Sequence, residues 1–178
     1  KLQVLLQEPG LSVAVAGVGG LGHLALQFAH KMGCELTAIS TSLDKREQAL
    51  AFGADHFIDS ADQTAMQAAV FAFDLLICTA NNTVNLGALF ETIKKRGRLI
   101  LLGFPDANFN STPLVAHDLT ISGSLLGSPD TMRQMLAFAH EHHITPMIEM
   151  MTMSRINEAI RRVQENKARY RIVLTNQS

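Results

Sequence analysis

Three glycines near the start of the chain have the spacing of a phosphate-binding turn. Gly17, Gly19 and Gly22 lie in the stretch VAVAGVGGLG, residues 13–22, between an apolar run and an amphipathic segment. In such a strand–turn–helix unit the first glycine allows the turn, the second lets a pyrophosphate approach the backbone, and the third lets helix and strand pack closely. The N–H groups at the helix N-terminus favour an anion. The pattern predicts dinucleotide binding, with a purely structural glycine turn as the alternative.

A cluster of hydroxyl and cationic side chains follows the second predicted strand. Ser40, Thr41 and Ser42 stand where NAD(H)-binding domains carry an acidic residue for the ribose 2′-hydroxyl, and Lys45 and Arg46 come one helical turn later. Hydroxyls and cations can bind a 2′-phosphate, whereas a carboxylate repels it. The cluster therefore predicts NADP(H) in preference to NAD(H). Alternatively, the hydroxyls cap the next helix, and the two roles are compatible.

Alternating strand and helix patterns surround these two clusters. Apolar spacing predicts helices over residues 20–32, 44–52, 61–71, 84–94, 132–142 and 154–165, with Lys94, Lys95 and Arg96 near the negative end of the fourth. The first strand ends at the glycine turn, and later strands are predicted over residues 36–39, 56–58, 73–79, 98–102, 119–125 and 170–174. This order predicts an α/β fold: a doubly wound, parallel, six-stranded sheet, or Rossmann fold, followed by a C-terminal helix–strand segment.

Composition excludes several classes of partner. Lys and Arg number 15 against 16 Asp and Glu, so there is no strong field for nucleic acid or an anionic membrane. No apolar run approaches the roughly 18 residues of a membrane span, and no targeting signal is visible. Cys34 and Cys78 are isolated, which favours buried packing in a reducing compartment, and we expect a cytoplasmic protein. Because the chain opens at Lys1 without an initiator methionine or a helix cap, we expect a fragment of a longer protein.

Four segments together resemble a known family. They are GVGGLGHLALQFAHKMG, AISTSLDKREQALAFGADHFIDS, KKRGRLILLG and RYRIVL, and they span nearly the whole chain. In register they resemble the C-terminal half of the zinc-dependent medium-chain alcohol dehydrogenases. The pairing of GGLGH with Ser-Thr-Ser-x-x-Lys is most similar to the cinnamyl alcohol dehydrogenase and NADP-dependent aldehyde reductase branch.

The resemblance implies a set of coenzyme-binding residues. The pyrophosphate would lie at Gly17, Gly19, Gly20, Leu21 and Gly22, and the 2′-phosphate at Ser40, Thr41, Ser42, Lys45 and Arg46. The riboside crevice would be lined by Thr79, Ala80, Leu102, Gly103 and Phe104, while Leu125, in the turn 124–127, would offer backbone groups to the carboxamide and Arg171 would reach the phosphates.

The resemblance also implies what lies outside this chain. In the family, zinc and a proton relay belong to an N-terminal domain, so no catalytic or metal-binding residue is expected here. Residues 1–129 would form the dinucleotide-binding domain, and residues 130–178 would return to complete the absent catalytic domain. The expected activity is hydride transfer between NADP(H) and a small primary alcohol or aldehyde. The resemblance further implies a homodimer joined near residues 119–125.

Other interpretations stay open on the residues alone. A non-catalytic NADPH-sensing module and a zinc-independent quinone or enoyl reductase of the same superfamily would share the glycine turn. A methyltransferase would need an acid where Ser40 stands. His23 is either a surface residue or a donor to the phosphate. His140, His142 and His143 point apart on a helix, so their number does not predict a metal site.

Overall fold

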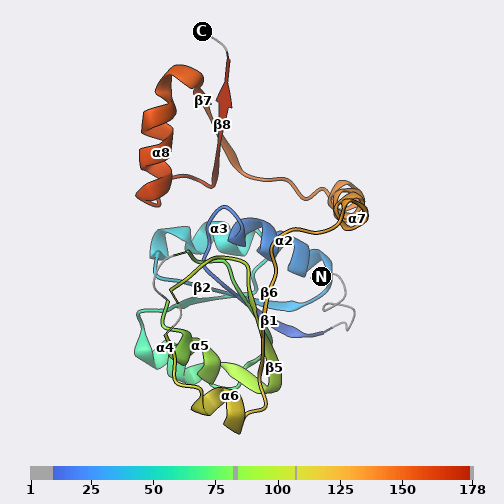
Figure 1. Ribbon diagram of the computed structural model, residues 1–178, viewed down its shortest axis with the longest axis vertical. Helices are drawn as coiled ribbons and strands as arrows, with labels where there is room; N and C mark the ends of the chain where they lie inside the picture. Colours follow the sequence, from blue (N-terminus) through green and yellow to red (C-terminus); the bar gives the residue numbers. More distant parts are fainter. Residues whose placement is uncertain (1–9, 82–83, 107, 177–178) are drawn as a thin grey trace. The chain divides into compact units, whose positions relative to one another are not determined.

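The computed structural model describes residues 10–81, 84–106 and 108–176 (Figure 1). The chain divides into two compact units between Ile144 and Thr145. The first unit is a parallel α/β sheet, and the second is a small strand–helix–strand unit. The predicted functional boundary after residue 129 does not coincide with this division, and it stays a prediction.

The first unit contains a six-stranded parallel sheet in the order β3-β2-β1-β4-β5-β6. The order reverses direction between β1 and β4, as in a doubly wound fold, so the predicted fold class is confirmed. Its strands are β1 (Ser12–Ala16), β2 (Glu35–Ser40), β3 (His56–Asp59), β4 (Phe73–Cys78), β5 (Ile93–Leu101) and β6 (Thr120–Gly123). Its helices are α2 (Gly22–Lys31), η1 (Leu43–Lys45), α3 (Arg46–Ala51), α4 (Gln63–Ala68), α5 (Leu86–Glu91), α6 (Thr112–Ala116) and α7 (Pro129–Glu141).

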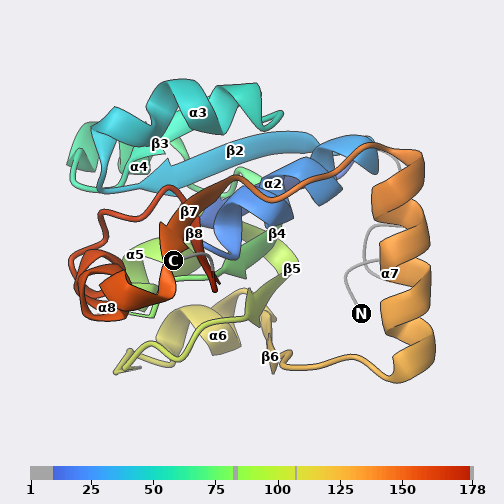
Figure 2. The same ribbon diagram turned by 90° about the horizontal axis from the view of Figure 1, so that it is seen from above.

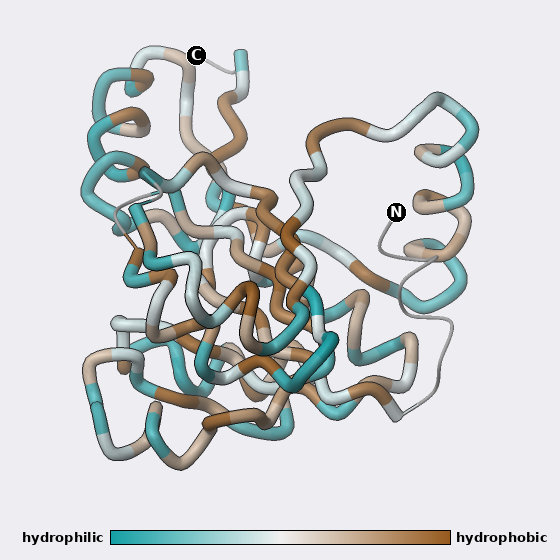
Figure 3. Tube along the Cα trace, turned by 60° about the horizontal axis from the view of Figure 1, so that its bottom comes forward, coloured by the Kyte–Doolittle hydropathy of each residue, from teal (hydrophilic) through white to brown (hydrophobic). Residues whose placement is uncertain are grey.

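Helices cover both faces of this sheet, and the burial pattern of the strands follows from that. Helices α2 and α3 lie on one face, with α4, α5 and α6 on the other (Figures 1 and 2). Strand β1 is therefore apolar and buried along nearly its whole length rather than alternating. Figure 3 colours the trace by hydropathy and shows hydrophobic stretches in its middle. One packed cluster of buried residues joins side chains of the strands to Leu86, Leu89 and Phe90 of α5.

The segment before Arg98 departs from the predicted structure. Lys94, Lys95 and Arg96 were expected near a helix end, but α5 ends at Glu91 and all three belong to β5. The pairing of β4 with β5 shifts register here, and Arg96 has a left-handed φ of 65°. This irregularity accommodates extra residues in β5. From sequence periodicity alone, the same residues were predicted as a continuation of the helix. Helix α6, between the predicted strands 98–102 and 119–125, was also not foreseen.

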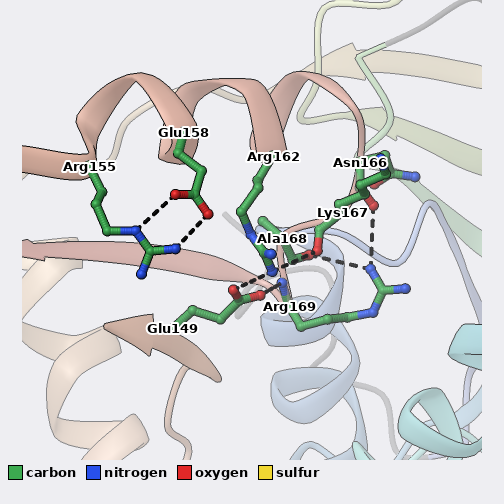
Figure 4. Close-up of polar contacts among 8 residues, drawn as sticks. All are labelled: Glu149, Arg155, Glu158, Arg162, Asn166, Lys167, Ala168 and Arg169. Atoms are coloured by element: carbon green, nitrogen blue, oxygen red, sulfur yellow. Dashed lines mark hydrogen bonds and ion pairs between the residues drawn. The ribbon is translucent and has the colours of Figure 1, made fainter. Parts of the chain in front are cut away.

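The second unit is held together by a parallel pair of strands and ion pairs. Strand β7 (Ile148–Thr152), which was not predicted, pairs with β8 (Arg171–Thr175), and η2 (Met153–Arg155) and α8 (Ile156–Gln164) connect them. Glu149 accepts from the Arg162 guanidinium at 2.6 Å and from the backbone of Arg169 (Figure 4). Along α8 the apolar side chains of residues 156, 160 and 163 are exposed in the described structure. That exposure fits a segment whose partner lies outside the chain, which remains a prediction.

Asp74 ties three strands together at the amino end of the sheet. Its Oδ2 accepts from the Ser12 backbone N–H at 3.0 Å and from Lys94 Nζ at 2.9 Å. Asp74→Ala is expected to lower the free energy of unfolding by about 1–2 kcal/mol, because a strand-end N–H and an ammonium lose a shared, partly buried acceptor. Urea unfolding of the variant and the wild type measures this difference in the free energy of unfolding. Arg133→Ala, which removes the exposed pair with Asp130, serves as control and should cost less than about 0.5 kcal/mol. Equal losses in both variants would contradict the prediction.

Candidate functional site

The glycine turn lies at the carboxyl end of β1, beside the point where the strand order reverses. Gly17 has a φ of +95°, a conformation that favours glycine, and its N–H donates to Ile39 O of β2 at 2.9 Å. A Cβ added to Gly22 would lie 1.9 Å from Gly17 O, so α2 packs against the strand without room for a side chain. The roles predicted for the first and third glycines are both visible in the fold.

Gly19 differs from its two neighbours in the motif. Its φ is not in the left-handed region, and a Cβ built on it would meet no described atom within 4 Å. The fold itself therefore gives no reason for glycine at this position. Open space against the backbone is what a pyrophosphate requires, and it is the role predicted for the second glycine.

The start of α2 presents unpaired N–H groups. Within the described part of the chain, the backbone N–H groups of Val18, Gly19, Leu21 and Gly22 donate to no acceptor. Leu21 at the N-cap offers no side-chain acceptor, and the first turn contains no acidic residue. Free donors at the positive end of a ten-residue helix are the arrangement that favours an anion.

Three hydroxyls stand at the carboxyl end of β2, next to the glycine turn in the sheet. Ser40 is buried, and its Oγ accepts from the Ser42 N–H at 3.1 Å. Ser42 precedes η1 but makes no side-chain cap, and α3 has Lys45 at its N-cap, so the alternative that these hydroxyls cap the next helix is wrong. Over the residues that the structure describes, none of the hydroxyls of Ser40, Thr41 and Ser42 donates to a protein acceptor. They remain available as donors.

The two cations of this cluster have different environments. Lys45, in η1, is only 3% exposed, whereas Arg46, at the start of α3, is exposed. Asp59 of β3 lies in register with Ser40, and its Oδ1 accepts from the Ala61 N–H at 2.9 Å. The hydroxyl cluster thus has both cations and one carboxylate close to it along the chain and across the sheet.

The loops after β4 and β5 form the other wall of the crevice. A Cβ on Gly103 would lie 2.2 Å from Ala80 O, so the two loops are in backbone contact. Asn81 Oδ1 accepts from the Phe104 N–H at 3.2 Å and fastens this contact. A cavity of about 470 Å³ opens beside it, lined by Leu101, Leu102, Gly103, Phe104, Pro105, Gly123, Ser124 and Leu125. The predicted residues Leu102, Gly103, Phe104 and Leu125 are thereby brought together.

Several predicted residues have other positions. Thr79 is buried, and its hydroxyl donates to Gly17 O at 2.8 Å rather than lining an open crevice. His23 is fully buried, so the surface interpretation is wrong. Arg171 lies on β8 in the second unit, and its contact with phosphates stays a prediction. Among the described residues no group of three or more His, Cys, Asp or Glu could hold a metal ion.

The two cysteines are packing residues. Cys34 and Cys78 are buried and unpaired, and burial raises the pKa of both thiols. A thiol with a raised pKa is protonated at neutral pH and is a poor nucleophile.

No helix in the described part of the chain has the length and apolar character needed to cross a bilayer.

Fold and site together define a Rossmann-type nucleotide-binding domain. Residues 20–141 match the zinc-binding dehydrogenase family, and the chain belongs to that family. It is similar to the probable formaldehyde dehydrogenase AdhA of Bacillus subtilis, 38% identical over 93% of this chain and 48% of that protein. It is also similar to the aldehyde reductase AdhA of Synechocystis, 38% identical over 95% of this chain and 51% of that protein.

Solved structures give the same result. A cinnamyl alcohol dehydrogenase of Sorghum bicolor superposes with a TM-score of 0.93 and 36% identity, over 97% of this chain and 50% of that one. A Helicobacter pylori CAD complexed with NADP(H) gives a TM-score of 0.87 and 26% identity, over 97% and 50%. The predicted family resemblance is confirmed. The chain spans about half the length of the relatives it matches.

Proposed function

We propose that this chain is the coenzyme-binding part of an NADP(H)-dependent alcohol dehydrogenase or aldehyde reductase. The observation that carries the proposal is Gly19: no described residue demands glycine there, and within the described part of the chain the N–H groups of Val18, Leu21 and Gly22 donate to no acceptor. The site fits a dinucleotide because the pyrophosphate would meet the open backbone of Gly19 and the N–H groups that begin α2. When bound, the nicotinamide supplies hydride chemistry. The chain's own residues bind and orient it.

The cavity beside β5 and β6 is the proposed place of the nicotinamide end. Its lining is largely apolar, with Leu101, Leu102, Phe104 and Leu125 among the wall residues. Apolar walls exclude water from the face of the ring, and backbone groups of the turn 124–127 offer partners to the carboxamide. The backbone contact between Gly103 and Ala80 keeps this wall close to the glycine turn.

The hydroxyl cluster supports NADP(H) as the coenzyme. Ser40, Thr41 and Ser42 keep their O–H donors, Arg46 is exposed nearby, and no acidic residue stands in the Ser40 position. Phosphate oxygens accept from hydroxyls and are attracted to guanidinium groups. Relatives support the same choice: an NADP-dependent alcohol dehydrogenase C of Mycolicibacterium smegmatis is 37% identical, over 96% of this chain and 49% of that protein.

The remaining parts of the proposal concern the whole protein. The substrate would be a small alcohol or aldehyde, and zinc would be held by residues outside this chain. Two copies would pair through β6, which is the edge strand of the sheet. The unpaired cysteines fit a reducing compartment such as the cytoplasm. Sedimentation of the full-length protein as a monomer would contradict the pairing.

Ser40→Asp tests the choice of coenzyme. A carboxylate here would repel the 2′-phosphate of NADPH and accept from the 2′-hydroxyl of NADH, so the affinity ratio of NADPH to NADH is expected to fall by at least about tenfold. Fluorescence titration of the reduced coenzymes gives both dissociation constants. Ser111→Asp, which adds the same charge at the start of α6, should leave the ratio unchanged.

Two results would contradict this assignment. Wild-type protein that bound NADH as tightly as NADPH would show that the hydroxyl cluster does not select a 2′-phosphate. If the affinity ratio of NADPH to NADH were unchanged in Ser40→Asp, Ser40 would not belong to the 2′-phosphate site. In the second case the exposed Arg46 would become the next residue to replace, because its guanidinium is the other group able to recognise the phosphate.

A further inference from the structure

Two carbonyls of the glycine turn are held by buried side chains from outside the motif's glycines. Thr79 Oγ1 donates to Gly17 O at 2.8 Å, and His23 Nδ1 lies 2.9 Å from Gly19 O. A carbonyl oxygen only accepts, so His23 Nδ1 carries the proton in this contact. Both side chains thus act as donors to the backbone of the turn.

Thr79 is fixed firmly enough to hold a carbonyl in one direction. It follows β4, its backbone N–H donates to Ala16 O at 2.9 Å, and the side chain is buried. Its Oγ1 also lies 3.0 Å from the place a Cβ on Gly22 would occupy. The hydroxyl therefore stands directly between the end of β1 and the start of α2.

His23 is fixed in a comparable way from the helix side. It is 0% exposed, and its ring packs against that of Phe52, with centroids 5.5 Å apart and planes inclined by 58°. Its backbone N–H also donates to Gly19 O, at 3.1 Å. Gly19 O therefore accepts twice from one residue, which restricts the rotation of its peptide plane.

Fixing a carbonyl also fixes the N–H of the same peptide plane. In a trans peptide the two groups point in opposite directions, so Gly17 O held by Thr79 turns the Val18 N–H away from the strand–helix contact. In the same way, Gly19 O held by His23 fixes the direction of the Gly20 N–H. The second of these peptide planes adjoins the open backbone of Gly19, and the first lies one residue before it.

We propose that Thr79 and His23 are positioning residues that preorganise the peptide N–H groups of the glycine turn for a pyrophosphate. The inference rests on the proposed dinucleotide site and adds two residues to it that touch no ligand themselves. A turn whose planes are already oriented loses less conformational freedom on binding. Their contribution should therefore appear in affinity for the diphosphate part of the coenzyme alone.

Thr79→Val and Thr79→Ser test the first positioning residue. Valine keeps the shape and removes the donor, so NADPH affinity is expected to fall about tenfold, whereas serine keeps the donor and should stay within about twofold of wild type. Adenosine 2′-monophosphate is the control ligand, because it carries the 2′-phosphate but no pyrophosphate. Its affinity, followed by NMR titration, should be unchanged in both variants, which also shows that they are folded.

His23→Leu and His23→Asn test the second residue in the same assay. Leucine removes the donor, and asparagine places an N–H₂ group near the position of Nδ1. We expect NADPH affinity to fall about tenfold with leucine and to be largely restored with asparagine. A common loss in both variants would show that the ring serves only to pack against Phe52, and this would overturn the role of His23 as a donor.

The outcomes separate this inference from the proposed function. Wild-type protein that fails to bind NADPH overturns the proposed function and the inference with it. NADPH binding in the wild type together with unchanged binding in Thr79→Val overturns only the inference for Thr79. Equal losses in Thr79→Val and Thr79→Ser, or parallel losses of NADPH and adenosine 2′-monophosphate affinity, also overturn it, because they indicate that Thr79 merely supports the fold.

Discussion

Gly19→Ala is expected to weaken NADPH binding by about 100-fold while leaving the thermal stability of the protein unchanged or slightly increased. The added methyl group would occupy space that no described atom fills within 4 Å and that the pyrophosphate is proposed to use. Displacing a diphosphate from the start of α2 would break charge-assisted hydrogen bonds worth about 1.5–3 kcal/mol each. Since φ is not left-handed at this position, alanine is not strained there and reduces the freedom of the unfolded chain.

Isothermal titration and a thermal melt of the same sample measure both halves of this prediction. The combination is what matters, because most substitutions that abolish binding also destabilise the fold. A variant that melts several degrees lower would show that Gly19 is needed for folding, and the structural-turn alternative raised on the sequence would then be correct. A stable variant that bound NADPH with wild-type affinity would show that the pyrophosphate does not lie against Gly19.

The sheet was predictable because its strands are buried on both faces. In β1 and β4 the apolar residues run almost without interruption, and after β1 the pattern changes to helical spacing directly behind the glycine turn. The start of β5 was not predictable from the sequence, because its basic residues have the composition of a helix C-terminus. Only pairing with β4, including the shift between Phe73 and Leu75, makes that segment a strand.

Strand β7 was missed for a related reason. Its sequence, IEMMT, has one buried residue, Met151, and methionine has little strand preference of its own. The strand forms because it pairs in register with β8, from Ile148 opposite Arg171 to Thr152 opposite Thr175. A partner more than twenty residues away in sequence leaves no local signal.

The site divides in the same way between local and distant information. The glycine turn and the hydroxyl cluster are continuous in sequence, so their spacing alone placed them at the carboxyl ends of β1 and β2. The contacts of Thr79 with Gly17 and of Asn81 with Phe104 join residues 62 and 23 positions apart. His23 was singled out beside the turn, but its burial depends on Phe52, which the fold brings from α3's end.

Gly22→Ala is expected to have the opposite effect from Gly19→Ala: a loss of about 2–3 kcal/mol in the free energy of unfolding. Alanine favours a helix over glycine by about 1 kcal/mol, which acts in the variant's favour. Against this, the methyl group would lie 1.9 Å from Gly17 O and 3.0 Å from Thr79 Oγ1. The first atom belongs to the backbone directly after β1, so the clash is relieved only by moving α2 away from the end of the strand.

A thermal melt should place the midpoint of Gly22→Ala about 5–10 °C below that of the wild type. The same substitution at Gly19 is the matched control, since it adds one methyl group three residues away with no described neighbour. If both variants melted with the wild type, α2 would not be in close contact with β1. If both variants were destabilised alike, a methyl group on Gly19 would have to clash with the fold. The space at Gly19 would then not be open, and the observation that carries the proposed function would fail.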